Sequence, residues 1–169
     1  MSPYKNGLLV MSTKSGINIG DYIQAVAAKQ FFDSIDLFLE RERLNQYEED
    51  PVRLIMNGWF MHEPQNWPPS PAIQPIFVSF HINSIAYDRL LAKQSIDYLK
   101  QHEPIGCRDI NTMELLQAKG VDAYFSACLT LTLDYKYKSE KKSKKCYFVD
   151  PYMPASRVNI SWLVKNCWI

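Results

Sequence analysis

Short apolar runs alternate with one-sided helical patterns through the first part of the chain. The runs that predict strands are residues 7–12, 35–39, 53–56, 76–80, 105–107 and 123–126. Helical spacing is found in a segment that begins at Asp21, in residues 92–101, and between Asp109 and Gly120. Strands that alternate with helices predict an α/β, Rossmann-like domain with a mainly parallel sheet and helices on both faces.

Two stretches carry more detailed structural predictions. In the helix that begins at Asp21, the spacing of apolar residues predicts an inner face made of Ile23, Val26, Ala27 and Phe31. Residues 59–75 contain five prolines, which argue against a regular helix or a central strand there.

The stretch from residue 104 to residue 133 predicts a strand–helix–strand unit with polar residues at both strand exits. Either Asp109 or Thr112 can accept hydrogen bonds from the first helical turn, and Gly120 is a stop signal after the last turn. In open α/β sheets, ligands bind at the carboxyl ends of the strands. We therefore expect ligand-facing residues at several exits, namely Asn18 to Asp21, Asn57 and Gly58, His81, Arg108 and Asp109, and Cys128 to Thr130.

Asp21 and His81 are the candidate catalytic residues at these exits. A carboxylate at position 21 can accept the proton of an attacking hydroxyl, or it can simply cap its helix. His81 can titrate near neutral pH, or it can be a hydrogen-bonded structural residue. Arg108 can bind an anion with its guanidinium fork, or it can form an ion pair with Asp109 that fixes the loop.

Other residues with candidate chemistry have structural interpretations as well. Trp59, Trp67 and the prolines between them form either a sugar-stacking wall or a rigid loop packed on the core. Cys107 and Cys128 are predicted to be buried thiols, because their spacing fits no cysteine-hydrolase signature. The glycines before the first helix match neither a dinucleotide motif nor a nucleoside-triphosphate motif.

From about residue 5 to residue 133, the chain resembles the polysaccharide pyruvyl transferase family. The main motif is G-x-R-D-x-x-[ST]-x-x-L-L, which here runs from Gly106 to Leu116 and precedes a Thr-rich turn. The other matching pieces are N-x-G-D at residues 18–21, and residues 56–59 and 79–82, which look like the branch found in bacterial surface-polysaccharide clusters.

The resemblance implies a transferase that moves the enolpyruvyl carbons of phosphoenolpyruvate onto two hydroxyls of a sugar and releases phosphate. It implies two Rossmann-like halves in a GT-B-like architecture. The acceptor sugar is expected against the N-terminal half, and phosphoenolpyruvate against Arg and His residues of the C-terminal half. We expect Asp21 and His81 to be catalytic. Substrate binding is expected from Asn18, Gly20, Asn57, Gly58, Arg108, Asp109 and Thr130.

Domain organisation shapes the expected activity. We expect a Rossmann-like domain at residues 1–133, a lysine-rich linker at 134–145, and the start of a truncated second α/β domain at 146–169. On this division the chain alone is expected to be inactive in pyruvyl transfer, because the donor-binding residues belong to the second half. Two rivals stay open: a glycan-binding or remnant module without catalysis, and a nucleotide-sugar glycosyltransferase.

Composition argues against several other classes of function. The net charge of +1 gives no reason to expect nucleic acid or an anionic membrane as the main partner. No apolar run is long enough to span a bilayer, and we expect no signal peptide. The four cysteines include no C-x-x-C pair, which predicts reduced thiols in the cytoplasm. No motif calls for a metal or a cofactor.

Overall fold

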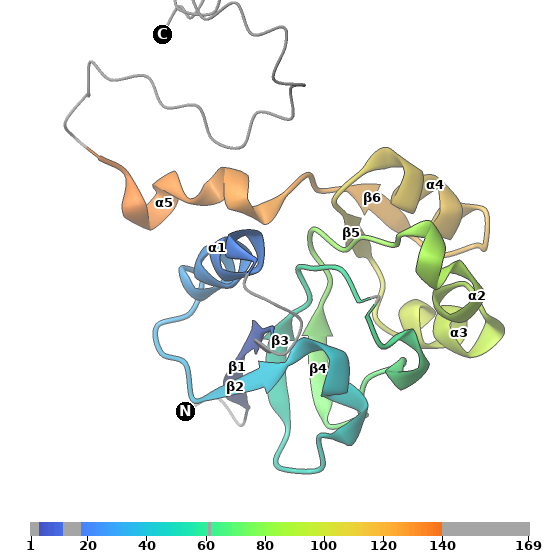
Figure 1. Cartoon of the computed structure of the whole chain (residues 1–169), viewed down its shortest axis with the longest axis horizontal. Coiled ribbons are helices and arrows are strands. Elements are labelled where there is room, and N and C mark those ends of the chain that lie inside the picture. The colour runs from blue at the N-terminus through green and yellow to red at the C-terminus, as the bar shows by residue number, and fades with distance from the viewer. Residues whose placement is uncertain (1–3, 12–17, 61, 140–169) are drawn as a thin grey trace, which may run out of the picture. The chain divides into compact units, whose positions relative to one another are not determined.

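The computed structural model describes residues 4–11, 18–60 and 62–139, and the compact unit built from them ends at Lys138. Its strands are β1 (Lys5–Val10), β2 (Leu37–Glu40), β3 (Val52–Ile55), β4 (Ile73–Ile76), β5 (Ile105–Cys107) and β6 (Ala123–Phe125). Every pairing between these strands is parallel, in one sheet of order β2-β1-β3-β4 and a second of β5-β6 (Figure 1). The predicted α/β class with a mainly parallel sheet is confirmed.

Hydrogen bonds beyond the end of β4 join the two sheets. The Phe80 amide donates to the Gly106 carbonyl at 2.9 Å, and the Arg108 amide donates to the Phe80 carbonyl at 2.8 Å. On the other side, the His81 amide donates to the Gly58 carbonyl at 3.0 Å. The strands thus form one parallel array in which the order changes direction between β1 and β3. Such a switch point is where doubly wound folds bind ligands.

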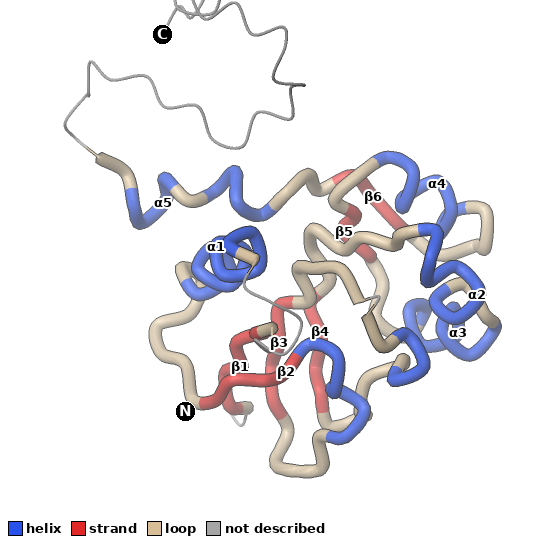
Figure 2. Tube along the Cα trace, in the orientation of Figure 1, coloured by secondary structure: helices blue, strands red, loops and turns tan. Residues whose placement is uncertain are grey.

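The helices connect successive strands (Figure 2). They are α1 (Ile19–Lys29), η2 (Arg41–Gln46), η3 (Pro64–Asn66), η4 (Ser84–Ala86), α2 (Tyr87–Leu90), α3 (Lys93–Lys100), α4 (Ile110–Gln117), η5 (Leu129–Thr132) and α5 (Asp134–Tyr137), where η marks 3₁₀ helices. Asp109 is the N-cap of α4 and accepts from the Thr112 amide at 2.9 Å. Gly120 follows α4 with φ +73°, so both predicted helix signals are confirmed.

Core packing occurs on both faces of the sheet. Leu8 and Leu9 are consecutive in β1, so their side chains point to opposite faces. Leu9 belongs to the larger core with residues of α2, α3 and α4, whereas Leu8 packs with Ala27 of α1 and Leu129 of η5. Helices therefore cover both faces of the sheet, as predicted.

The predicted inner face of α1 is mostly wrong. Ala27 is fully buried, but Ile23, Val26 and Phe31 are 38%, 41% and 47% exposed. The helix instead packs through the small neighbours Ala27 and Ala28. Two apolar faces of α1 could pack on the sheet. The face with Ala27 and Ala28 is buried because its smaller side chains allow the helix to approach the sheet more closely, which leaves Ile23, Val26 and Phe31 exposed.

Residues 59–75 contain no central strand, as predicted: β4 begins inside this stretch and includes Pro75, but it is the edge strand of its four-stranded sheet. The amides of Val52 and Met56 donate to the carbonyls of Ala72 and Ile76. Successive backbone groups of a strand point alternately to its two sides, so the nitrogen of Pro75 points away from β3. On that other side no described strand pairs with β4. The missing N–H of proline therefore costs no ladder hydrogen bond.

The predicted second-domain segment, residues 146–169, lies outside the described residues, as does the second half of the predicted lysine-rich linker, residues 140–145; the first part of that linker forms α5. The second half of the expected GT-B-like architecture therefore has no described counterpart here. Within the part of the chain that is described, no helix combines the length and apolar character needed to cross a membrane.

Candidate functional site

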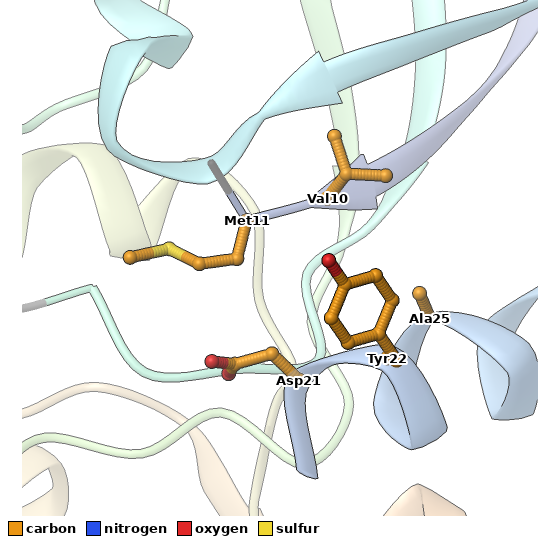
Figure 3. Close-up of a pocket in the computed structure, with 5 residues that line it drawn as sticks. All are labelled: Val10, Met11, Asp21, Tyr22 and Ala25. Atoms are coloured by element: carbon orange, nitrogen blue, oxygen red, sulfur yellow. The ribbon is translucent and has the colours of Figure 1, made fainter. Parts of the chain in front are cut away.

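The carboxyl ends of β1 and β3 border a hollow at the switch point. It is small and open to solvent. Asp21 and Tyr22 project from the first turn of α1 toward Val10 and Met11 (Figure 3). The rest of the lining comes from Leu9, Gln24, Ala25, Arg41 and Asn57. The sheet thus brings a helix start, two strand ends and the residue after β2 to one place.

A buried charged cluster forms the floor of this hollow. Arg41 follows β2 directly, and its side chain is 4% exposed. Its Nη1 donates to Asp21 Oδ1 at 2.8 Å, and its Nε donates to Glu42 Oε1 at 3.2 Å. The remaining terminal nitrogen, Nη2, is buried without a hydrogen-bond partner among the described residues. Asp21 is therefore neither the helix cap nor a free carboxylate, but half of a buried ion pair.

The other predicted residues near the hollow have local structural contacts. Asn18 is the N-cap of α1, and its Oδ1 accepts from the Gly20 amide at 2.9 Å. Asn57 is 3% exposed and donates from Nδ2 to the Gln24 carbonyl at 2.8 Å. These bonds fix the start of α1 against the end of β3. The side chains of Asn18 and Asn57 therefore position the residues that line the hollow.

A second cluster lies where the chain leaves β4. His81 Nδ1 and Asp109 Oδ2 are 2.5 Å apart, and the two side chains are 19% and 35% exposed. The hydroxyl of Thr112 donates to Asp109 Oδ2 at 3.0 Å and accepts from the Ile82 amide at 3.1 Å. The structure thus brings two predicted site residues, His81 and Asp109, into direct contact.

The contact with Asp109 determines which nitrogen of the His81 ring carries the hydrogen. A carboxylate only accepts, so the hydrogen between the two groups belongs to Nδ1. In the neutral ring Nε2 is then an acceptor, and no described residue donates to it. Burial raises the pKa of Asp109, but bonds from the Thr112 amide, His81 and the Thr112 hydroxyl outweigh burial and hold that pKa below its usual value.

Gly58 connects the two clusters. Its carbonyl accepts from the His81 amide at 3.0 Å. A Cβ built on Gly58 would lie 3.5 Å from Arg41 Cδ and 3.7 Å from Leu9 Cδ2. The Arg41 side chain therefore packs against the same glycine whose backbone holds His81. Asp21, Arg41, Gly58, His81 and Asp109 form a continuous series along the carboxyl edge of the sheet.

Arg108 and Thr130 are not joined to these clusters by a hydrogen bond between side chains. The predicted Arg108–Asp109 ion pair does not form, because Asp109 bonds to His81 and Thr112 instead. Within the described residues, the Arg108 guanidinium has no hydrogen bond or ion pair. Thr130 Oγ1 lies 3.0 Å from Cys128 Sγ.

Trp59 and Trp67 have different surroundings. Trp67 is 4% exposed and packs among Phe60, Phe77 and Phe80, so the core interpretation is correct for it. Trp59 is half-buried, and its ring lies edge-on to His81 with centroids 6.1 Å apart. Of Trp59 and Trp67, Trp59 is therefore the one placed to contact a ligand at this edge.

Cys107 and Gly106 are packing residues. Burial, and secondarily the Asp109 charge, raises the pKa of the Cys107 thiol to about 12, as expected for an unreactive buried thiol. A Cβ on Gly106 would lie 2.9 Å from both the Phe77 carbonyl oxygen and the Tyr124 hydroxyl. The motif glycine is thus explained by close contact between strands.

Arg41 is not among the site residues predicted from the sequence. Its position obeys the same strand-exit rule as the other candidates, because Arg41 comes directly after β2 and two residues after the end of the strand predicted at residues 35–39. Its partner Asp21 lies 20 residues earlier, beyond any local pattern.

Replacing Asp109 with asparagine is expected to let the neutral His81 ring carry its hydrogen on either nitrogen. Asparagine is as good an N-cap as aspartate, so α4 should persist. Its amide can donate as well as accept, so it no longer requires the hydrogen on Nδ1. Long-range proton–nitrogen correlation spectra should show a single Nδ1–H form of neutral His81 in the wild type and a mixture of tautomers in Asp109→Asn.

His102 provides the internal control for that spectrum, because its ring contacts Tyr98 and Phe77 and lies apart from Asp109. Its signals should be the same in both proteins. An Nε2–H form of His81 in the wild type, or identical His81 tautomers in the two proteins, would contradict the assigned role of Asp109.

The family comparison agrees with the motifs at this edge. A parallel α/β domain with polar groups at its strand exits is typical of transferases, among other classes. The family model described as polysaccharide pyruvyl transferase matches residues 18–167. The chain belongs to this family. No curated protein and no solved structure was found to match it.

Proposed function

We propose that the chain acts in polysaccharide pyruvyl transfer and that the described domain binds and activates the acceptor sugar. The observation that carries this proposal is the His81–Asp109 pair, held at a strand exit in a member of this family. We also propose that this domain is the acceptor half of a GT-B-like architecture. Its parallel α/β sheet and its family membership support that assignment.

In this proposal His81 is the general base for an acceptor hydroxyl. Its free Nε2 takes the hydroxyl proton as the oxygen attacks, and the imidazolium that forms is stabilised by the Asp109 carboxylate on Nδ1. Asp109 is thus a positioning residue. The pair has the base-and-orienter arrangement found in other group-transfer enzymes, whose general bases contribute roughly 10²–10⁴-fold to the rate.

The donor in this proposal is phosphoenolpyruvate. Two sugar oxygens bond to its C2 carbon while the bond from C2 to the phosphate oxygen breaks. One hydroxyl proton ends on the methylene carbon, which becomes a methyl group, and the other leaves with the phosphate. The products are a cyclic pyruvate ketal and inorganic phosphate. The family resemblance implies that most contacts to the donor come from the C-terminal half of the proteins in this family.

The remaining predicted residues have narrower roles in the proposal. Asp21 contacts an acceptor hydroxyl through its second oxygen, Oδ2, to which no described residue donates. Arg108 is available for an acidic group of the substrate, because its guanidinium has no hydrogen bond or ion pair within the described residues. Asn18, Gly20, Asn57 and Gly58 shape the hollow, and Thr130 lies at a neighbouring strand exit.

The test uses the full chain with a panel of methyl galactosides, mannosides and N-acetylhexosaminides. Calorimetric titration is expected to show saturable binding of at least one of these sugars. In parallel, the chain is incubated with the sugars and either phosphoenolpyruvate or nucleotide sugars. Acceptor-dependent phosphate release supports pyruvyl transfer directly, whereas release of a nucleoside diphosphate identifies a glycosyltransferase and overturns the proposal.

A further inference from the structure

Thr112, in the first turn of α4, lies behind the His81–Asp109 pair and is 0% exposed. Its backbone amide donates to Asp109 Oδ1 at 2.9 Å, and its hydroxyl donates to Asp109 Oδ2 at 3.0 Å. One residue therefore donates to both oxygens of the carboxylate and fixes its plane. Oδ2 is also the oxygen that faces His81 Nδ1.

A backbone group determines the direction of the Thr112 hydroxyl. The Ile82 amide donates to Thr112 Oγ1 at 3.1 Å, so this oxygen is an acceptor in that bond and its own hydrogen is left to donate. His81 Nδ1 lies 3.4 Å from the same oxygen, but it carries a hydrogen and cannot accept. The hydroxyl hydrogen therefore goes to Asp109 Oδ2.

These bonds tie His81 to Asp109 at two points. Ile82 follows His81 in the chain, so Thr112 holds both the backbone beside the imidazole and the carboxylate that faces the imidazole ring. The hydroxyl is not needed to start α4, because the bond from the Thr112 amide to Asp109 already makes the cap. A hydrogen bond to an ionised group is stronger than one between neutral groups. The hydroxyl thus acts on the orientation of Asp109.

We infer that Thr112 is a positioning residue for His81. Its hydroxyl keeps Asp109 Oδ2 on the Nδ1–H of His81, which leaves Nε2 as the acceptor that faces a sugar hydroxyl. The catalytic meaning of this arrangement rests on the proposed function. The positioning itself can be tested without any substrate.

The test replaces Thr112 in the full chain. Thr112→Val keeps the shape of the side chain and the backbone amide of the cap, but it removes the hydroxyl. Long-range proton–nitrogen correlation spectra are expected to show neutral His81 changing from a single Nδ1–H form to a mixture of tautomers. The hydrogen on Nδ1 should exchange with water roughly tenfold faster, as the loss of one hydrogen bond to a charged group implies. Thr112→Ser keeps the hydroxyl and should retain the single form.

Thr132→Val is the matched control. Thr132 Oγ1 accepts from Gln30 Nε2 at 2.8 Å and donates to the Leu129 carbonyl at 2.7 Å, so this variant also loses one accepted and one donated bond. Its His81 spectrum should match that of the wild type. If Thr112→Val also retains the single Nδ1–H form, the hydroxyl has only a structural role and the inference is overturned.

A measurement on the wild type does not depend on the folding of a variant. The hydroxyl hydrogen of Thr112 should exchange slowly with water and show nuclear Overhauser contacts to the Ile82 amide hydrogen and to the hydrogen on His81 Nδ1. A rapidly exchanging hydroxyl without these contacts would overturn the inference. Sugar binding and phosphate release test the proposed function separately, so failure of either proposal can be recognised while the other stands.

Discussion

Phe80→Ala is expected to destabilise the domain by about 3–5 kcal/mol, the usual cost of truncating a buried phenylalanine to alanine. Phe80 is 0% exposed, and its ring centroid lies 5.2 Å from that of Phe77 and 5.7 Å from those of Phe60 and Trp67. Its backbone also joins the two sheets. Removing the ring leaves a cavity beside the strand exit that holds His81. Urea unfolding at neutral pH measures the loss.

Phe38→Ala is the matched control for this experiment. Phe38 lies in β2 and is 68% exposed, so the same truncation there removes little buried area. Its free energy of unfolding should stay within about 0.5 kcal/mol of the wild type. Equal losses for the two variants would show that the aromatic cluster around Phe80 is not the core of this domain.

Arg41→Met is expected to cost about 3–5 kcal/mol, because removing one partner of a buried ion pair leaves its counter-charges unpaired. The carboxylates of Asp21 and Glu42 have side-chain exposures of 12% and 6%, so water compensates them poorly. Glu42 has a second anchor, the Glu63 amide at 2.9 Å, and stays in place. The loss is again measured by urea unfolding.

Two further variants make this prediction specific. Arg43→Met removes an exposed arginine from the same helix, and its effect should stay within about 0.5 kcal/mol. Adding Asp21→Asn to Arg41→Met should restore part of the lost stability, since one unpaired carboxylate becomes neutral. If Arg41→Met costs no more than Arg43→Met, the buried cluster is not a structural unit.

Local sequence signals were sufficient to predict the fold class, because apolar runs and helix caps act over a few residues. The strand at residues 105–107, the Asp109 cap and the Gly120 stop were all predicted correctly. The packing of α1 was not, since the spacing of Ile23 and Val26 is equally compatible with a core face and with an exposed stripe. Which face is buried depends on how closely the helix approaches the sheet.

The candidate site was predicted at the level of strand exits, but its pairings were not. His81 and Asp109 lie 28 residues apart and meet only because the segment after β4 pairs with β5. Arg108 and Asp109 are neighbours in sequence and do not pair. The orientation of a side chain at a strand exit depends on partners brought together by the sheet, and no local pattern encodes them.

The central claim is that one acceptor site extends along the carboxyl edge from Asp21 and Arg41 to His81 and Asp109. The most direct measurement is a nuclear magnetic resonance titration of the nitrogen-labelled full chain with the tightest-binding methyl glycoside. The account predicts that the amide signals of Asp21, Gly58, His81 and Asp109 shift together with a single dissociation constant. Shifts confined to the surface around Lys93 and Tyr98 of α3, or to only one of the two clusters, would contradict it.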